Sequence, residues 1–324
     1  MKRIALSFAL SWPLLATGVM AQEIPPRVDK VSTSIMLLCT KVEMHGRFHS
    51  IDAYGAHRSP IDVEKIETCS NAFQISKDQV VSAAHVAEEI PLILARYFIH
   101  KLATLQVYGF HAGHTPERID RVWLSRSLVS FDGLTYTGGS EEYSASWPGK
   151  MEAVAVQKFL ASLVPLRETT LLTSHTLEIR ATDASRDLML LSISPPRELE
   201  AYVAISKNHQ PHDTAWGIAA QIPWKKSGPI DIIVTSGTVH ERLYTNDAPQ
   251  QSMVISMQRP TKGGYSGGFA VDEDGALIGV THASSAFEQA WIFDIPHPCN
   301  DRYPCRRIVV SAQSVREFLK EHSK

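Results

Sequence analysis

The sequence predicts a β-rich enzyme domain with a serine nucleophile, and three observations indicate it. Residues 71–75 and 79–82 alternate apolar and polar side chains, as half-buried strands do. The chain has 324 residues, 44% hydrophobic and 20% charged, which excludes a disordered protein and provides enough apolar material for two small barrels. The third observation is a set of three segments that supply a histidine, an aspartate and a serine, in that order.

The chain begins with the three parts of a secretory signal peptide. Lys2 and Arg3 precede an apolar run, and Ala21 ends a small-residue cleavage site. We therefore expect residues 1–21 to be removed and the protein to be periplasmic or secreted. The apolar run is shorter than the roughly 20 residues that span a membrane, and Pro13 interrupts it, so no membrane span is expected after signal removal.

The charge balance excludes one class of partner. The formal net charge is -2, and removal of the basic leader makes the chain more acidic. A protein that binds nucleic acid through its phosphates carries a basic surface, so we expect no nucleic-acid partner. The sequence contains no internal repeat and no low-complexity tract.

The three segments supply the residue types that nucleophilic catalysis needs. His85 follows the strand predicted at 79–82, Asp187 precedes an apolar run, and Ser266 lies in the sequence GGYSGG at 263–268. A serine hydroxyl becomes a good nucleophile when a neutral imidazole takes its proton, and a carboxylate must hold that imidazole in one tautomer. We expect Ser266 to attack the substrate, His85 to act as general base and Asp187 to orient His85.

The glycines beside Ser266 fit the same chemistry. The backbone N–H groups of Gly264 and Ser266 are expected to form the oxyanion hole, where a side chain would be in the way. Taken one at a time, the segments have simpler interpretations as a glycine-rich turn, a histidine at a strand end and a capping aspartate. Their common order favours catalysis, because the other large class of serine hydrolases places the acid and the histidine after the serine.

Together these segments resemble the trypsin/chymotrypsin-like serine peptidases, and among them the bacterial HtrA (Deg) type and the glutamyl endopeptidases. Residues 82–85 read Ser-Ala-Ala-His where the family has Thr-Ala-Ala-His, and residues 178–191 are similar to its approach to the catalytic aspartate. Residues 234–239 and 269–280 resemble successive strands of its second barrel. The resemblance implies an all-β fold of two six-stranded antiparallel barrels of the chymotrypsin type, with the active site between them.

The resemblance also implies how the domain is organised. The expected parts are a peptidase domain at 22–324, a first barrel at about 30–195 with an insertion at about 92–175, a second barrel at about 213–310 and a C-terminal helix at about 311–322. The insertion is expected because His85 and Asp187 are about twice as far apart as in compact family members. Ser311 is a possible cap of the helix, and no PDZ module of the HtrA kind is expected after it.

Substrate preference is implied only by resemblance. Thr261 and His282 are similar to the residues that glutamate-specific relatives place in the specificity pocket, although His282 is shifted by one position, and they imply an acidic preference. Alternatively, His282 packs behind the catalytic residues. Tyr265 stands where the digestive enzymes have an aspartate that pairs with a newly released N-terminus, so we expect no activation switch of that type.

The four cysteines are expected to form disulfides, because an exported protein meets an oxidising compartment. We favour the pairs Cys39 with Cys69 and Cys299 with Cys305, although three connectivities are possible. No Cys-x-x-Cys spacing occurs, so no structural zinc is expected, and the chemistry needs neither a metal nor an organic cofactor.

These observations predict an exported serine endopeptidase that acts on protein or peptide substrates through an acyl-enzyme at Ser266. The alternative from a different class is a catalytically silent binding or scaffold protein on a peptidase fold. A third interpretation is an esterase that uses the same three residues.

Overall fold

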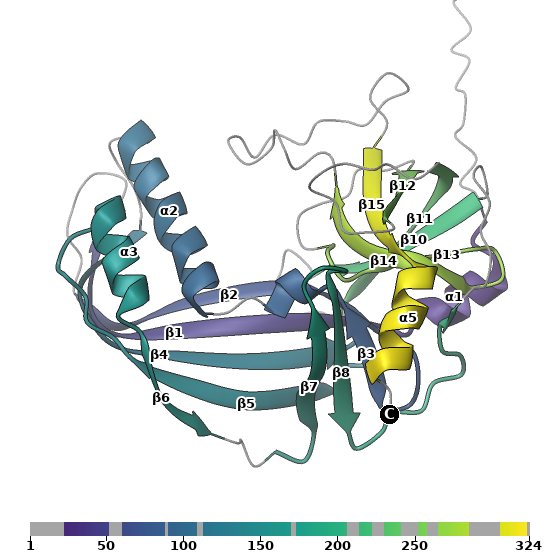
Figure 1. Ribbon diagram of the computed structural model, residues 1–324, viewed down its shortest axis with the longest axis horizontal. Helices are drawn as coiled ribbons and strands as arrows, with labels where there is room; N and C mark the ends of the chain where they lie inside the picture. Colours follow the sequence, from purple (N-terminus) through teal and green to yellow (C-terminus); the bar gives the residue numbers. More distant parts are fainter. Residues whose placement is uncertain are drawn as a thin grey trace, which may run out of the picture.

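The strands of the protein form two sheets, each of which closes on itself (Figure 1). The computed structural model describes residues 23–51, 60–87, 90–108, 113–169, 173–205, 214–221, 230–240, 252–257, 265–284 and 305–322. The predicted signal peptide therefore lies outside the described residues. None of the helices in these ranges is long and apolar enough to cross a membrane.

The first sheet has the strand order β4-β1-β2-β3-β8-β7-β5-β6, and a further pairing of β4 with β5 closes a ring. Its strands are β1 (Ile35–Ile51), β2 (Ile61–Gln74), β3 (Gln79–Ser82), β4 (Gly113–Ser130), β5 (Thr135–Ser144), β6 (Val164–Thr169), β7 (Thr176–Asp183) and β8 (Leu188–Ser194). Strand β6 pairs only with β5 and lies outside the ring.

The second sheet has the order β13-β10-β11-β12-β15-β14-β9, and a pairing of β13 with β14 closes a second ring. Its strands are β9 (Ala204–Ile205), β10 (Thr214–Gln221), β11 (Asp231–His240), β12 (Ser252–Met257), β13 (Phe269–Val271), β14 (Ala276–Ser284) and β15 (Cys305–Ser311). The short strand β9 runs parallel to β14 at the edge.

The prediction of two closed β-barrels is confirmed, with one difference in strand number. The second ring has six strands, as expected, whereas the first has seven. The extra strand arises because the hairpin of β4 and β5 fills the space between β1 and β7. Strands β4 and β5, which lie in the stretch 92–175, therefore form part of the barrel wall, and the insertion expected there stays a prediction.

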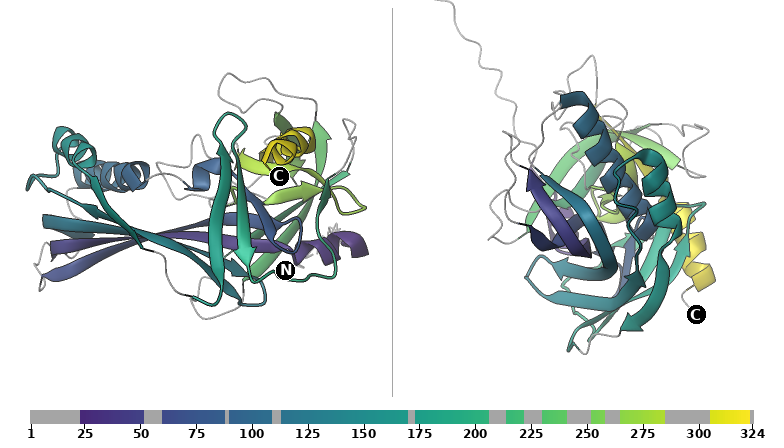
Figure 2. Two further views of the ribbon diagram at one scale, coloured as in Figure 1. Left: turned by 60° about the horizontal axis from the view of Figure 1, so that its bottom comes forward. Right: turned by 90° about the vertical axis from the view of Figure 1, so that its left-hand side faces the viewer.

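Long strands carry part of the first sheet beyond its barrel (Figures 1 and 2). Strands β1 and β4 have 17 and 18 residues and remain paired over most of their length. Helices α2 (Ile90–Tyr108) and α3 (Ala153–Ala161) pack on this extension, which we call the wing. Phe98 of α2 stacks on Trp147 with ring centroids 5.2 Å apart, and Phe159 of α3 contacts both rings. The wing thus has a hydrophobic core of its own.

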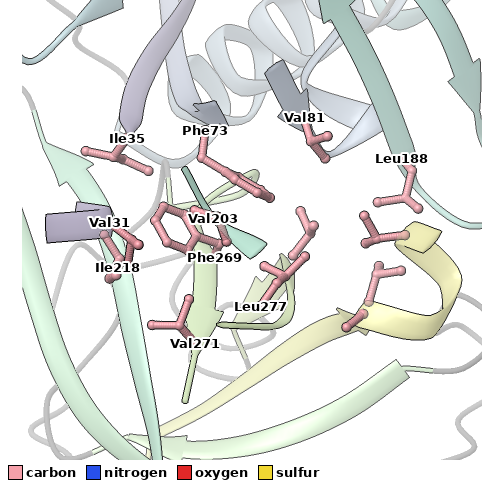
Figure 3. Packing of buried hydrophobic residues seen from close by; sticks show 14 of the residues in the cluster. Val31, Ile35, Phe73, Val81, Leu188, Val203, Ile218, Phe269, Val271 and Leu277 are labelled. Carbon is pink, nitrogen blue, oxygen red and sulfur yellow. The ribbon is translucent and has the colours of Figure 1, made fainter. Parts of the chain in front are cut away.

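The two barrels share another core (Figure 3). Phe73 of β2 and Phe269 of β13 face one another with ring centroids 4.6 Å apart. Helix α1 (Pro26–Ser32) and helix α5 (Ala312–His322) add apolar side chains to the same cluster, among them Val31 and Phe318. Burial of apolar side chains from both barrels holds the two halves in one arrangement.

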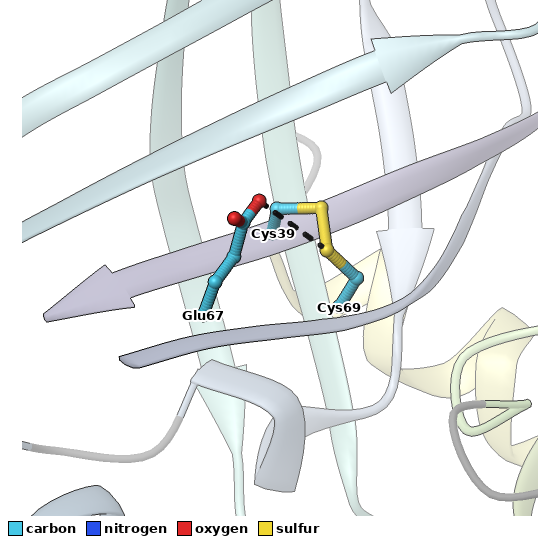
Figure 4. Close-up of a disulfide and its surroundings, with 3 residues drawn as sticks. All are labelled: Cys39, Glu67 and Cys69. Carbon is cyan, nitrogen blue, oxygen red and sulfur yellow. Dashed lines mark hydrogen bonds between the residues drawn. A yellow bond between two sulfur atoms is a disulfide. The ribbon is translucent and has the colours of Figure 1, made fainter. Parts of the chain in front are cut away.

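One of the two expected disulfides is present, and it joins Cys39 of β1 to Cys69 of β2 (Figure 4). The two residues are direct neighbours in the antiparallel pairing of these strands. Cys299 lies outside the described residues, and Cys305 begins β15 with a side chain that is also outside them, so the second pairing stays a prediction.

Candidate active site

The first barrel brings His85 and Asp187 together through the pairing of β3 with β8. Ser82 at the end of β3 is opposite Met189 near the start of β8, so the residues just beyond these ends are neighbours. His85 lies in the short 3-10 helix η1 (Ala84–Ala87). Asp187 has a φ of 54°, a left-handed conformation that aspartate tolerates better than most residues, and its carbonyl accepts a hydrogen bond from the Ala84 N–H.

The two side chains are in the arrangement of a catalytic pair. The Nδ1 of His85 donates to Oδ2 of Asp187 over 2.8 Å, and the backbone N–H of His85 donates to Oδ1 over 2.9 Å. Asp187 is 4% exposed, whereas the His85 side chain is partly exposed. Since a carboxylate only accepts, Nδ1 carries the proton of a neutral imidazole and Nε2 is left as the proton acceptor.

A second histidine, His282 of β14, contacts the same carboxylate. Its Nδ1 donates to Oδ2 of Asp187, and its ring meets the His85 ring edge to face with centroids 5.4 Å apart. A bulge in the pairing of β14 with β15 falls at this residue, because Thr281 and Ala283 are in register with consecutive residues of β15. Bulges change the direction of a side chain next to a site. Nδ1 of His282 is therefore not available to a substrate.

The contacts of Asp187 decide its charge. Burial alone would raise its pKa, but the hydrogen bonds from His282 and His85 outweigh burial and lower the pKa from 3.8 to about 2. Asp187 is therefore ionised at neutral pH. An ionised carboxylate in this position would stabilise a positive charge on His85 if that imidazole took a proton.

The turn that carries Ser266 is held by both barrels. The N–H of Asn71 on β2 donates to the Ser266 carbonyl over 2.7 Å, and the N–H of Gly267 donates to the Thr281 carbonyl over 2.8 Å. Gly267 has a φ of +78°, and a Cβ there would lie 1.9 Å from the Asn71 carbonyl oxygen. Only glycine fits this position without a backbone shift.

Asn71 makes further contacts that link the barrels. Its carbonyl accepts a hydrogen bond from the Ser82 hydroxyl over 2.6 Å, and its Oδ1 accepts one from the Ala220 N–H of β10. The residue is fully buried. The sequence analysis did not single out Asn71. Its amide side chain is one of two in a strand that was predicted from the alternation of apolar and polar positions.

The third expected catalytic residue is near the other two but is bonded differently. The Ser266 hydroxyl donates to the backbone carbonyl of His282 over 3.2 Å, and within the described residues no hydrogen bond joins it to His85. Gly264 and Thr261 lie outside the described residues. The roles predicted for Ser266, Gly264 and Thr261 therefore stay predictions.

In the part of the chain that the structure describes, two groups of side chains have the composition of a metal site. The possible ligand atoms of His85, Asp187 and His282 lie within 4.8 Å of one another, so these residues could hold a divalent cation. Two N–H donors on one carboxylate satisfy the same arrangement without an ion. The other group includes Cys39 and Cys69, whose sulfur atoms are bonded to each other and offer no thiolate.

Comparison with known proteins found a family model that matches part of the chain. The family model of the trypsin-like peptidase domain matches residues 153–280, a stretch that includes Asp187 and Ser266 but not His85. Among solved structures, the chain is similar to "HtrA-type protease AlgW with decapeptide", at 14% identity and a TM-score of 0.48, over 91% of this chain and 67% of that one. No curated protein matches the sequence.

Proposed function

We propose that this chain, which carries a trypsin-like peptidase domain, is an exported serine endopeptidase that forms an acyl-enzyme at Ser266. The observation that carries the proposal is the bond from His85 Nδ1 to the buried, ionised Asp187, because it leaves Nε2 as a base on the side of the ring away from the acid. The basic and apolar N-terminus is what supports export.

The proposed reaction begins when the Ser266 hydroxyl leaves the His282 carbonyl and turns to His85. Its proton passes to Nε2 as Oγ bonds to the carbonyl carbon of the substrate, and Asp187 stabilises the resulting imidazolium. The backbone N–H groups of Gly264 and Ser266 bind the oxyanion. The peptide C–N bond then breaks, the leaving amine takes the proton from His85, and a water molecule activated by His85 hydrolyses the acyl-enzyme.

His282 has two parts in this proposal. Its imidazole is a second donor to Asp187, and its carbonyl holds the hydroxyl of Ser266 in the resting state. Both contacts come from one bulged residue of β14. We propose that His282 positions Asp187 and thereby His85, and that it does not select the substrate through Nδ1.

One observation favours the alternative of a silent binding protein. The Ser266 hydroxyl is bonded to a carbonyl oxygen, which cannot take its proton, and not to the imidazole. A protein in which this bond persists would keep the fold and the peptide-binding surface without turnover.

The decisive test is covalent labelling of the purified mature protein with a fluorophosphonate, followed by mass mapping of the modified residue. We expect the label on Ser266 and its complete loss in Ser266→Ala. The Ser192→Ala variant is a matched control, because the Ser192 hydroxyl of β8 bonds to Arg180 and is remote from the proposed chemistry.

Absence of labelling in a folded protein would favour the silent scaffold. Labelling with hydrolysis of esters but of no peptide bond would instead favour an esterase, so matched ester and peptide substrates complete the test.

A further inference from the structure

A buried arginine lies inside the second barrel. Arg307 is on β15, between β12 and β14 (Figure 1), and is 1% exposed. Its guanidinium lies against Gly217 of β10, where a Cβ would be 2.5 Å from Nη1. Val309, two residues further along the same strand, belongs to the apolar cluster of this barrel. The missing side chain at Gly217 therefore provides the space that the guanidinium occupies.

Among the described residues, the charge of Arg307 has no counter-ion. Within the ranges that the structure describes, no carboxylate pairs with it, and its Nε and Nη1 have no hydrogen-bond partner. Arg197, which is also buried, donates instead to Asp132 over 3.1 Å and to Gln74 over 2.8 Å. Burial lowers the pKa of Arg307 to about 10, although Tyr265 opposes this effect, so Arg307 is a cation at neutral pH.

An unpaired buried cation destabilises a fold, because the lost hydration of the charge is not replaced. A cation in this state is a candidate for binding an anionic group of a ligand, since such a group would supply the missing partner. The ring of Tyr265 offers the guanidinium a cation–π contact at 5.7 Å but no formal charge.

The position of Arg307 relates it to the proposed reaction. Tyr265 immediately precedes Ser266 in the chain. On the other side, Ser284 of β14 is in register with Arg307 and lies two residues beyond His282. Arg307 is thus linked to Ser266 through Tyr265, and to His282 through strand β14.

We propose that Arg307 is a specificity-determining residue that binds the carboxylate of an aspartate or glutamate side chain in the substrate residue whose carbonyl Ser266 attacks. This inference rests on the proposed function of the site, and it depends on neither Thr261 nor the imidazole of His282. Guanidinium and carboxylate form paired hydrogen bonds, which are strong where water is excluded. The flexible Met257, which also abuts Gly217, must move to admit the ligand.

The test measures binding to Ser266→Ala, so that it does not depend on turnover. Two peptides, acetylated and amidated at their ends, differ only by Glu or Gln at one position, and the Glu side chain is the only carboxylate. We expect the Glu peptide to bind at least about 10-fold more tightly, and the ratio to fall to about one when Arg307→Met is added. The matched control is Arg197→Met, a second buried arginine, which should leave the ratio unchanged.

Three results would overturn the assignment. The first is equal affinity for the two peptides, including no binding of either. The second is a Glu preference that survives Arg307→Met. The third is tighter binding of a Gln peptide with a free C-terminal carboxylate than of the amidated Glu peptide. That result would mean that Arg307 binds the C-terminus of a peptide and not an acidic side chain.

Folding of the variant is checked by its melting temperature. Arg307→Met replaces an unpaired buried charge by an apolar side chain, so it should melt no lower than the parent protein. If it does not fold, Arg307→Lys keeps the charge but not the planar fork, and should reduce the Glu preference at least about threefold. An unchanged preference in that variant would count against the proposal. If the wild-type protein is not labelled but the Glu peptide still binds more tightly, the proposed catalysis at Ser266 is wrong and the role of Arg307 in binding stands.

Discussion

At the scale of single residues, the main feature of the site is that two histidines donate hydrogen bonds to the carboxylate of Asp187. The carboxylate accepts bonds from the backbone and ring of His85 and from the ring of His282. The bond from His282 lowers its pKa more than that from His85 does. Both histidines therefore contribute to the lowered pKa of Asp187, although only His85 has a direct part in the proposed reaction.

Replacement of His282 by Ala should raise the pKa of Asp187. A carboxyl whose pKa is lowered on folding stabilises the protein above its unfolded pKa, and this contribution is lost as pH falls through the folded pKa. For Asp187 this contribution to stability is lost as the pH falls from 3.8 to about 2. In the variant the folded pKa is higher, so the lower limit of this pH range should rise. The contribution at neutral pH should also fall, from about 2 kcal/mol to half of that or less.

Urea unfolding between about pH 6 and about pH 2 measures this change. The variant's deficit in stability should be largest near neutral pH and should shrink as the solution becomes acidic. His240→Ala is the control, because His240 bonds to Ser256 in the same barrel and should give a deficit that does not follow the titration of Asp187. A pH-independent deficit in His282→Ala would show that His282 is only a packing residue.

At the scale of the element, the turn that carries Ser266 depends on Gly267. An alanine there would need a left-handed backbone and would place its Cβ against the Asn71 carbonyl. We expect Gly267→Ala to destabilise the protein by at least about 2 kcal/mol and to slow labelling of Ser266 by at least about 100-fold.

Gly133→Ala is the control that separates the backbone strain of an alanine with positive φ from the steric clash of its Cβ. Gly133 has a φ of +85° with nothing within 4 Å of a built Cβ, so its variant has the strain alone. It should lose about 1 kcal/mol and label at the normal rate. Equal labelling rates in the two variants would show that the contact with Asn71 does not determine the conformation of the turn that carries Ser266.

At the scale of the whole molecule, the barrels should act as one unit because they share a core. Phe73→Ala deletes a ring that packs on Phe269 across the boundary and lies two residues from Asn71. We expect a loss of roughly 3 to 5 kcal/mol in one calorimetric transition, and slower labelling of Ser266 at a temperature where the variant is folded.

Phe98→Ala is the matched substitution in the wing. Phe98 is equally buried but packs on Trp147 and Phe159, away from the boundary between the barrels. Its variant should lose similar stability and keep the labelling rate. If both variants slowed labelling equally, the site would depend on general stability and not on the shared core.

The sequence by itself predicted the β-rich class and the meeting of His85 with Asp187, and it favoured the Cys39–Cys69 pair among three connectivities. Local alternation and the order of three short segments were sufficient for this, because each segment lies at the end of a strand. His85 and Asp187, which are far apart in the chain, were thus predicted together.

Only the tertiary structure decided the rest. The seventh strand and the contacts of Asn71 depend on strand register, and the second hydrogen bond to Asp187 comes from a residue at a bulge. The surroundings of Arg307 depend on which strands lie next to one another in the second barrel. Hydrophobic periodicity specifies which face of a strand is buried, but not which strand lies next to it or where a bulge turns a side chain. These contacts join residues from distant parts of the chain, so they became visible only in the folded protein.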